Sequence, residues 1–423
     1  MKTKLLAGVI ATCFAAPVLA QSSVQIYGIA DAGIMKTKGE STRIFSGGAD
    51  GSRIGFKGTE DIGGGFKAIF NLEARVELDT GTQTPALLYN NDGFYLLRGM
   101  QALPLAIRTG LAGNLRQFGV AAVNSEKALF DRTAMVGLIT PVGAVLLGRM
   151  YTPGYEVFAA ADTFESGTAG AWGGVTGGTA GFTALGADIR SQKSIQYRIA
   201  TPAGIGGSIM YGFRNSGYVG RYNRFYGAAV TYKANGIDAG IGHNSGEDLD
   251  GRKSLTTTTI GGSYTLGDFK FFAGYHDQKN KNSALLRDYV AAWDTGIAPG
   301  LVPLGAPTAT ALRNIFVTNI TRNTQIDAAS AQIGMHYRMG AGRIMASIAR
   351  QNDRSDSNSD ATLMAVGYDY NLSKRTDVYT VLAQIKNQNE GQYTPGIAGT
   401  PAGFTKVIGE DSHAIQIGVR HRF

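Results

Sequence analysis

The sequence has almost no cysteine, little proline and no long apolar run. Its single cysteine, Cys13, lies within the first twenty residues, so the rest of the chain can form no disulfide and has no thiolate for catalysis or metal binding. No later segment contains eighteen consecutive apolar residues, which argues against a membrane-spanning helix. Proline supplies 11 of the 423 residues and glycine 59, a balance that suits strands joined by tight turns.

The first twenty residues have the pattern of a cleavable secretory peptide. Lys2 and Lys4 precede an apolar stretch, Leu5–Ala16, which Val18-Leu19-Ala20 follows as a cleavage site. The stretch is too short to anchor the chain in a bilayer. We therefore expect residues 1–20 to be a signal peptide. The mature chain, residues 21–423, then has 38 basic and 32 acidic residues and a net charge of +6.

Side chains of two kinds alternate most clearly along Gly65–Leu78. Residues of one parity are apolar, and residues of the other parity are mostly charged or polar: Lys67, Asn71, Glu73, Arg75 and Glu77. Because the side-chain period of a strand is two, these sets lie on opposite faces. A face with this density of charge needs water, so it cannot be the core of a sandwich.

The same alternation recurs along the chain often enough to define sixteen strands. The fold class that this predicts is all-β, a transmembrane antiparallel β-barrel with a polar interior. The predicted strands are Val24–Met35, Ser52–Glu60, Gly65–Leu78, Phe130–Thr140, Ala144–Met150, Ser194–Thr201, Gly207–Arg214, Phe225–Ala234, Asp238–Asn244, Thr256–Leu266, Phe269–Asp277, Ala328–Met339, Arg343–Gln351, Thr362–Asn371, Val378–Lys386 and His413–Phe423.

The connections between these strands alternate between short and long. Short turns such as Gly267-Asp268 and Gly340-Ala341-Gly342 are typical of the periplasmic end of an outer-membrane barrel, and long polar loops are typical of its outer end. The chain is long enough for two or three soluble domains, but no linker or change in composition divides it. A single barrel domain over residues 21–423 is the simpler interpretation.

Several motifs resemble those of the Gram-negative general porins of betaproteobacterial type. They are Ser23-Val24-Gln25-Ile26-Tyr27-Gly28, Gly51–Asp61, Gly64–Glu73, Leu147–Pro153 and the terminal Arg420-His421-Arg422-Phe423. The resemblance extends over nearly the whole mature chain. It implies a sixteen-stranded barrel in the outer membrane, assembled as a homotrimer, that passes small hydrophilic solutes. It also implies contact with outer-membrane lipid and lipopolysaccharide, and recognition of Phe423 by the barrel-assembly machinery.

Strict alternation places more basic than acidic residues on the lumen face, which favours anions in the pore. The basic set is Arg53, Lys57, Lys67, Arg75, Arg198, Arg214, Lys270, Arg338, Arg420 and Arg422, and the acidic set is Glu73 and Glu77.

The resemblance implies that residues 151–193 fold back into the barrel as a constriction loop whose acidic residues face a basic wall. Arg53 and Arg75 are the best candidates for that wall, because both have lumen parity. Arg149 and Arg190 flank the loop, and Arg149 would need a bulge to point inward. The candidate set is therefore Arg53, Arg75, Arg149, Arg190 and Arg198 on the basic side and Glu73, Asp162 and Glu165 on the acidic side.

Other functions find less support in the sequence. The five histidines, His243, His276, His336, His413 and His421, have no close metal-ligand spacing, and we expect no metal and no cofactor. The basic residues alternate along strands without clustering among aromatics, which argues against nucleic-acid binding. A substrate-specific channel for organic acids or phosphate stays open as an alternative. A barrel enzyme such as a lipase or protease would need a nucleophile beside a histidine at the rim, and no such pair is evident.

Two segments depart from the expected pattern. Pro85–Lys127 is long and apolar for an outer loop, which suggests a segment that reaches over a neighbouring subunit or an extra hairpin, with a floppy loop as the alternative. Gln278–Asp327 is also long and could cover part of the channel mouth.

Overall fold

The computed structural model describes residues 23–83, 97–116, 128–176, 189–215, 222–283, 286–396 and 404–423. The predicted signal peptide, residues 1–20, lies outside the described residues. Where the structure describes helices, none is both long and apolar enough to cross a membrane.

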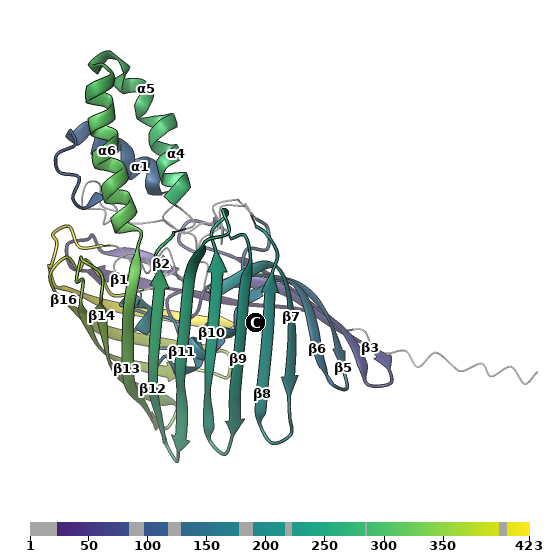
Figure 1. Ribbon diagram of the computed structural model, residues 1–423. Coiled ribbons are helices and arrows are strands. Elements are labelled where there is room, and N and C mark those ends of the chain that lie inside the picture. The colour runs from purple at the N-terminus through teal and green to yellow at the C-terminus, as the bar shows by residue number, and fades with distance from the viewer. Residues whose placement is uncertain are drawn as a thin grey trace, which may run out of the picture.

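The described residues contain seventeen strands in one closed antiparallel sheet, in which consecutive strands pair from β3 to β17 (Figure 1). The first and last strands, β1 and β17, pair from Ile29 with Arg422 to Thr37 with Ala414 and so close the barrel. Both β2 and β3 pair with β1, at successive levels, and together act as one strand. The barrel therefore has sixteen strands, as predicted. Their bounds are β1 Ser23–Thr37, β2 Arg43–Ser46, β3 Arg53–Gly63, β4 Phe66–Arg75, β5 Thr133–Thr140, β6 Gly143–Tyr151, β7 Arg190–Ala200, β8 Ile205–Gly212, β9 Phe225–Ala234, β10 Ile237–Glu247, β11 Lys253–Leu266, β12 Phe269–Asn280, β13 Ile326–Met339, β14 Gly342–Asp353, β15 Ala361–Asn371, β16 Thr376–Asn387 and β17 Ser412–Arg422.

The two faces of the wall differ in the way the alternation predicted. In β17, Ile415 and Ile417 are about half exposed on the outer face, whereas Gln416 and Arg420 are buried on the inner face. Exposed isoleucine, leucine, valine, phenylalanine and tyrosine side chains recur on the outer face of nearly every strand. Because a soluble protein rarely exposes so large an apolar surface, this face is suited to lipid.

One end of the barrel bears a helical cap that the sequence analysis did not foresee (Figure 1). It combines α1 (Leu105–Arg116) from the loop after β4 with the helices of the loop after β12. Apolar side chains from both loops share one core, which includes Leu103, Leu111, Trp293 and Phe316. The helices of the second loop are α4 Leu286–Gly296, α5 Ala298–Leu301, η3 Val302–Leu304 and α6 Ala306–Asn323.

The cap corrects one alternative for Pro85–Lys127. An extra hairpin is wrong for Leu105–Arg116, which is helical. Residues 84–96 and 117–127 lie outside the described residues. Glu390 ties the cap to the barrel rim, because its carboxylate pairs with Arg322 at 2.9 Å and with Arg98 at 3.3 Å. The two long loops depart from the usual pattern because each loop buries the apolar residues of the other.

A candidate constriction inside the barrel

The segment after β6 turns into the barrel and begins with a short helix, α2 (Pro153–Ala161). Thr152 caps this helix by accepting the Tyr155 N–H at 3.3 Å, and Pro153 occupies the first turn, where a missing N–H costs nothing. Asn244 of β10 fixes the same end: its Oδ1 accepts the Gly154 N–H at 3.1 Å and its Nδ2 donates to Thr152 Oγ1 at 3.0 Å. The start of α2 is therefore fastened to the barrel wall.

A row of glycines on the inner wall lets α2 and the loop after it lie close to the sheet. Gly240, Gly261 and Gly274 are directly paired across β10, β11 and β12. A Cβ on Gly261 would lie 2.9 Å from Ala161 Cβ, and one on Gly274 would lie 2.7 Å from the Trp172 ring. Contacts this short do not occur between real side chains. The missing side chains thus create the space that the segment occupies.

Asp162 fastens the turn that follows α2. Its carboxylate is fully buried and accepts the backbone N–H groups of Phe164 at 3.0 Å, Trp172 at 3.1 Å and Ser166 at 3.2 Å. Burial raises the pKa of Asp162 to about 7, against the opposing effect of these hydrogen bonds. The side chain therefore folds the loop and does not face the water of the lumen.

Further bonds hold the loop against the opposite strands. Gln332 Nε2 donates to the Ala161 carbonyl at 2.8 Å, and the Ala169 N–H donates to Gln416 Oε1 at 2.7 Å. Arg343 of β14 forms a bidentate ion pair with Glu165, at 2.7 and 2.9 Å. The loop is thus secured to β13, β14 and β17 as well as to β10.

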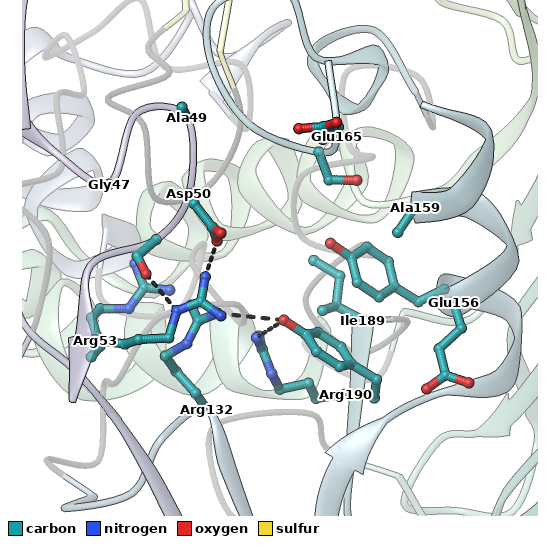
Figure 2. A pocket seen from close by; sticks show the side chains of 15 residues that line it. Gly47, Ala49, Asp50, Arg53, Arg132, Glu156, Ala159, Glu165, Ile189 and Arg190 are labelled. Atoms are coloured by element: carbon teal, nitrogen blue, oxygen red, sulfur yellow. Dashed lines mark hydrogen bonds and ion pairs between the residues drawn. The ribbon is translucent and has the colours of Figure 1, made fainter. Parts of the chain in front are cut away.

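Between this loop and the wall of β3, β4 and β7 lies a cavity of about 310 Å³. Figure 2 shows Arg53, Arg132 and Arg190 on one side of it and Glu156 and Glu165 on the other. The full lining is Gly47, Ala49, Asp50, Gly51, Arg53, Arg75, Arg132, Tyr151, Tyr155, Glu156, Ala159, Glu165, Ser166, Ile189 and Arg190.

Carboxylates behind the wall orient its arginines. Glu73 accepts from Arg132 Nε at 2.6 Å, lies 3.6 Å from Arg53 Nη1, and also accepts the Tyr27 hydroxyl at 3.1 Å. Arg53 forms a further ion pair with Asp50 and donates to the Gly51 carbonyl at 2.7 Å. These bonds hold the guanidinium groups in place at the edge of the cavity.

Arg75 is almost fully enclosed, as Arg132 is. Its guanidinium lies 3.2 Å from Glu77 Oε1 and 3.5 Å from Asp131 Oδ2, and all three side chains are largely buried. Charge-assisted contacts of this kind fix a side chain in one orientation. The charge of Arg75 is therefore locally compensated to a greater degree than its position on the cavity lining suggests.

Tyr151, the last residue of β6, lies between two of the arginines. Its hydroxyl accepts from Arg190 Nη2 at 2.7 Å and from Arg132 Nη2 at 3.4 Å. The Arg190 guanidinium also lies 4.3 Å from the ring centroid, within the range of a cation–π contact. On its other side Tyr151 stacks on Tyr155 of α2, with ring centroids 5.2 Å apart. The tyrosine pair therefore joins the basic wall to the loop.

Of the residues predicted from sequence for the basic wall, Arg53, Arg75 and Arg190 line the cavity. Arg198 lies beside it, paired with Glu156 at 2.5 Å. Arg149 does not line it: the guanidinium donates to the Asp131 carbonyl at 2.7 Å and to Gln192 Oε1 at 3.0 Å. The register of β6 and β7 shifts between Gly148 and Met150, which is the kind of irregularity that an inward-pointing Arg149 would require.

Of the predicted acidic residues, Glu165 lines the cavity, Glu73 lies behind the wall, and Asp162 is inside the loop. Sequence reasoning missed Arg132 and Tyr151. Strict alternation turns both outward, since Arg132 shares the parity of Val136 and Tyr151 that of Leu147, two exposed residues. Arg132 precedes β5, and the register of β6 and β7 shifts between Gly148 and Met150, so parity counted from the strand interior carries over to neither Arg132 nor Tyr151. The available signal was the charged pair Asp131-Arg132 near the start of the predicted strand Phe130–Thr140.

Comparisons with known proteins agree with this architecture. A family model described as Gram-negative porin matches residues 6–390. Outer membrane porin protein 32 of Delftia acidovorans is 28% identical over 433 residues and is covered completely, as is this chain. An outer membrane porin protein of Bordetella pertussis is 24% identical over 471 residues, again with complete coverage of both chains.

Solved porin structures have the same fold. An anion-selective porin from Comamonas acidovorans superposes with a TM-score of 0.64 at 22% identity, over 95% of this chain and all of the other. An outer membrane protein of Vibrio cholerae, solved in a trimer form, superposes with a TM-score of 0.59 at 13% identity, over 95% and 99% of the two chains. The family match over most of the chain and the closed sixteen-stranded barrel lead to one conclusion. This protein belongs to the Gram-negative porins and forms an outer-membrane channel for the passive diffusion of small hydrophilic solutes.

Proposed function

We propose that this porin prefers anions, and that solutes are selected where the loop after β6 approaches the arginine wall. The observation that carries the proposal is the cavity itself, which brings Arg53, Arg75, Arg132 and Arg190 together around one space. Arginine stays charged even when partly removed from water, so the positive field persists in a narrow passage. Rings of arginine or lysine are a general means of favouring anions in a pore.

The positions of the carboxylates support a field directed across the passage. Glu156 and Glu165 belong to the loop, on the side opposite the arginines (Figure 2). A field of this direction orients water and dipolar solutes as they pass, which selects among them without tight binding. On this proposal, residues 151–193 form the constriction loop of the channel. Solutes pass through the channel without chemical change.

Assembly and export are part of the same proposal. We infer a homotrimer, because the related Vibrio cholerae protein is described in a trimer form, and a signal peptide that is cleaved after residue 20. Phe423 closes the last strand beside Gly28, where its N–H donates to the Gly28 carbonyl at 3.1 Å, and is the proposed recognition point for the assembly machinery.

A salt-gradient recording tests the charge preference. The mature protein is purified and inserted into a planar bilayer under a tenfold KCl gradient. We expect a reversal potential with the sign of the chloride equilibrium potential. Insertion is expected to raise the current in groups of three equal steps. A reversal potential of the potassium sign would refute anion preference. Block that saturates with one organic acid or with phosphate would favour a substrate-specific channel.

A further inference from the structure

Two arginines of the wall meet at a neutral oxygen, the hydroxyl of Tyr151. This hydroxyl accepts from Arg190 Nη2 at 2.7 Å and from Arg132 Nη2 at 3.4 Å. The two distances place these guanidinium nitrogens no more than about 6 Å apart, where like charges repel each other. The hydroxyl therefore holds together two side chains that would otherwise move apart.

Strand pairing and the loop fix the place of this hydroxyl. Tyr151 pairs directly with Arg190 across β6 and β7, and directly paired residues project from the same face of a sheet. The Tyr151 ring begins a row of stacked aromatic rings, in which Tyr155 lies 6.2 Å from Phe158 and Phe158 lies 4.5 Å from Trp172. Phe158 and Trp172 are buried. The hydroxyl is thus held on a rigid support that extends into the packed side of the loop.

The two arginines depend on the hydroxyl to different degrees. Arg132 also donates to Glu73, at 2.6 Å, and keeps that contact whatever happens at Tyr151. Arg190 has no ion pair among the described residues, and its guanidinium otherwise lies over the Tyr151 ring at 4.3 Å. A hydrogen bond from a charged donor is stronger than a cation–π contact of this kind. The orientation of Arg190 therefore depends mainly on the hydroxyl.

We propose that Tyr151 is a positioning residue for ion selection. Its hydroxyl holds Arg190 beside Arg132 at the passage and, because it is neutral, leaves the charge of Arg190 uncompensated. A carboxylate in the same place would orient the guanidinium but would also weaken the field that favours anions. This inference rests on the proposed anion preference and names a residue on which that preference depends.

Loss of the hydroxyl should move Arg190 away from the wall. Arg132 repels its guanidinium, while Glu156 and Glu165 attract it from the opposite side of the cavity (Figure 2). Contact with either carboxylate would compensate the charge of Arg190 and draw its side chain across the passage. The preference for anions should therefore weaken even though no charged residue has been removed.

Reversal potentials under a tenfold KCl gradient test this role. Tyr151→Phe keeps the stacked ring and removes only the hydroxyl. The permeability ratio of chloride to potassium should fall at least about twofold in this variant, toward the roughly threefold fall expected for Arg190→Gln. Circular dichroism checks that each variant is folded.

Two further variants separate positioning from a general loss of packing. In the double variant Tyr151→Phe with Arg190→Gln, the ratio should equal that of Arg190→Gln alone, because the hydroxyl acts through Arg190. Tyr222→Phe is the matched control, since it also removes a buried hydroxyl bonded to β7. That hydroxyl lies 2.8 Å from Ser191 Oγ and accepts the Gln192 N–H at 3.2 Å, but Tyr222 does not line the cavity. The ratio in Tyr222→Phe should therefore match the wild type.

Two results would overturn this inference and leave the proposed function intact. One is a wild-type ratio in Tyr151→Phe when Arg190→Gln lowers it. The other is a double variant in which the two effects multiply, because Tyr151 would then act independently of Arg190. A reversal potential of the potassium sign in the wild type would refute the anion preference itself, and this inference with it.

Discussion

Replacing Arg53 and Arg75 with glutamine should shift this channel from anions toward cations. Both side chains line the cavity beside the loop, from neighbouring positions that pair directly across β3 and β4. Removing them leaves Asp50, Glu73 and Glu77 less compensated. Each substitution therefore makes the passage more negative by one full charge, while the volume of the side chain changes little.

Coulomb's law gives the size of the shift. An ion at roughly 7 Å from one charge in bulk water has an interaction energy of about 0.6 kcal/mol. Screening over a Debye length of about 10 Å at 0.1 M salt halves this to about 0.3 kcal/mol. Two charges then change the partition of anions about threefold downward and of cations about threefold upward, so the permeability ratio of chloride to potassium should fall roughly eightfold.

The assay is the reversal potential under a KCl gradient, with Arg338→Gln as the control. Arg338 is an exposed cation near the short turn before β14, away from the cavity, so its loss should change the ratio little. Arg53→Gln alone should give about a threefold change in the ratio. An unchanged reversal potential in a folded double variant would refute the placement of the selective wall.

Folding needs its own check, because Arg75 is buried between Glu77 and Asp131. Removing one partner of a buried ion pair costs about 3–5 kcal/mol when the other charge stays unpaired. The single variant at Arg53 avoids this cost, since Asp50 is substantially exposed and Glu73 keeps its bond to Arg132. Thermal unfolding followed by circular dichroism should show a lower midpoint for Arg75→Gln than for Arg53→Gln.

Three further perturbations address the loop and the cap. Gly274→Ala places a methyl group 2.7 Å from the Trp172 ring, so it should push the loop into the lumen at a cost of about 1–3 kcal/mol. Gly207→Ala is the control, because its methyl group would have no neighbour nearer than 3.5 Å and would leave the loop in place. Single-channel conductance should fall only in Gly274→Ala. Burial in the folded loop raises the pKa of Asp162 to about 7, so the folded state favours the protonated side chain. The stability of the loop should therefore fall as the pH rises from about 4 to about 7. Hydrogen exchange of the Trp172 amide measures this dependence, which Asp162→Asn should abolish; an identical pH profile in the variant would contradict the assignment. Glu390→Gln removes the carboxylate that pairs with Arg322 and Arg98, and the partly exposed pair with Arg322 is worth about 1 kcal/mol. Hydrogen exchange in α6 should therefore become at least about fivefold faster, while the barrel is unaffected. Equal rates in the variant would show that the apolar core alone holds the cap.

The strands could be predicted from sequence because each strand meets two different solvents. Along β17, Ile415, Ile417 and Val419 meet lipid and Gln416 and Arg420 face the interior, so the pattern is local and needs no knowledge of partners. The exception is β2, which is too short, at four residues, for alternation to stand out. The helical cap was missed for a different reason. Its core joins Leu111 to Phe316, and no local pattern reports a contact between loops so far apart in the chain.

Individual site residues were harder to assign than strands. Parity turns Arg53 and Arg75 to the inner face, and both line the cavity, from positions that pair directly across β3 and β4. Asp162 shows the limit of reasoning from residue type. An aspartate in a loop looks the same in sequence whether it faces water or accepts backbone N–H groups, and here it does the latter. Its placement depends on the fold of a loop that has no periodicity.

The electrostatic field in the lumen depends more on how far each cation lies from a carboxylate than on how many cations there are. Arg420 and Arg422 were counted among the lumen cations, but both pair with Asp377, at 3.1 Å and 2.6 Å, so their fields largely cancel at short range. Arg190 differs from them. Its guanidinium donates to the Tyr151 hydroxyl and lies over the Tyr151 ring, and among the described residues it has no ion pair. A cation whose nearest carboxylates lie across the cavity contributes a stronger field to the passage than a cation in contact with a carboxylate. Counting basic residues along strands therefore overstates the field where, as at Arg420 and Arg422, the cations contact a carboxylate.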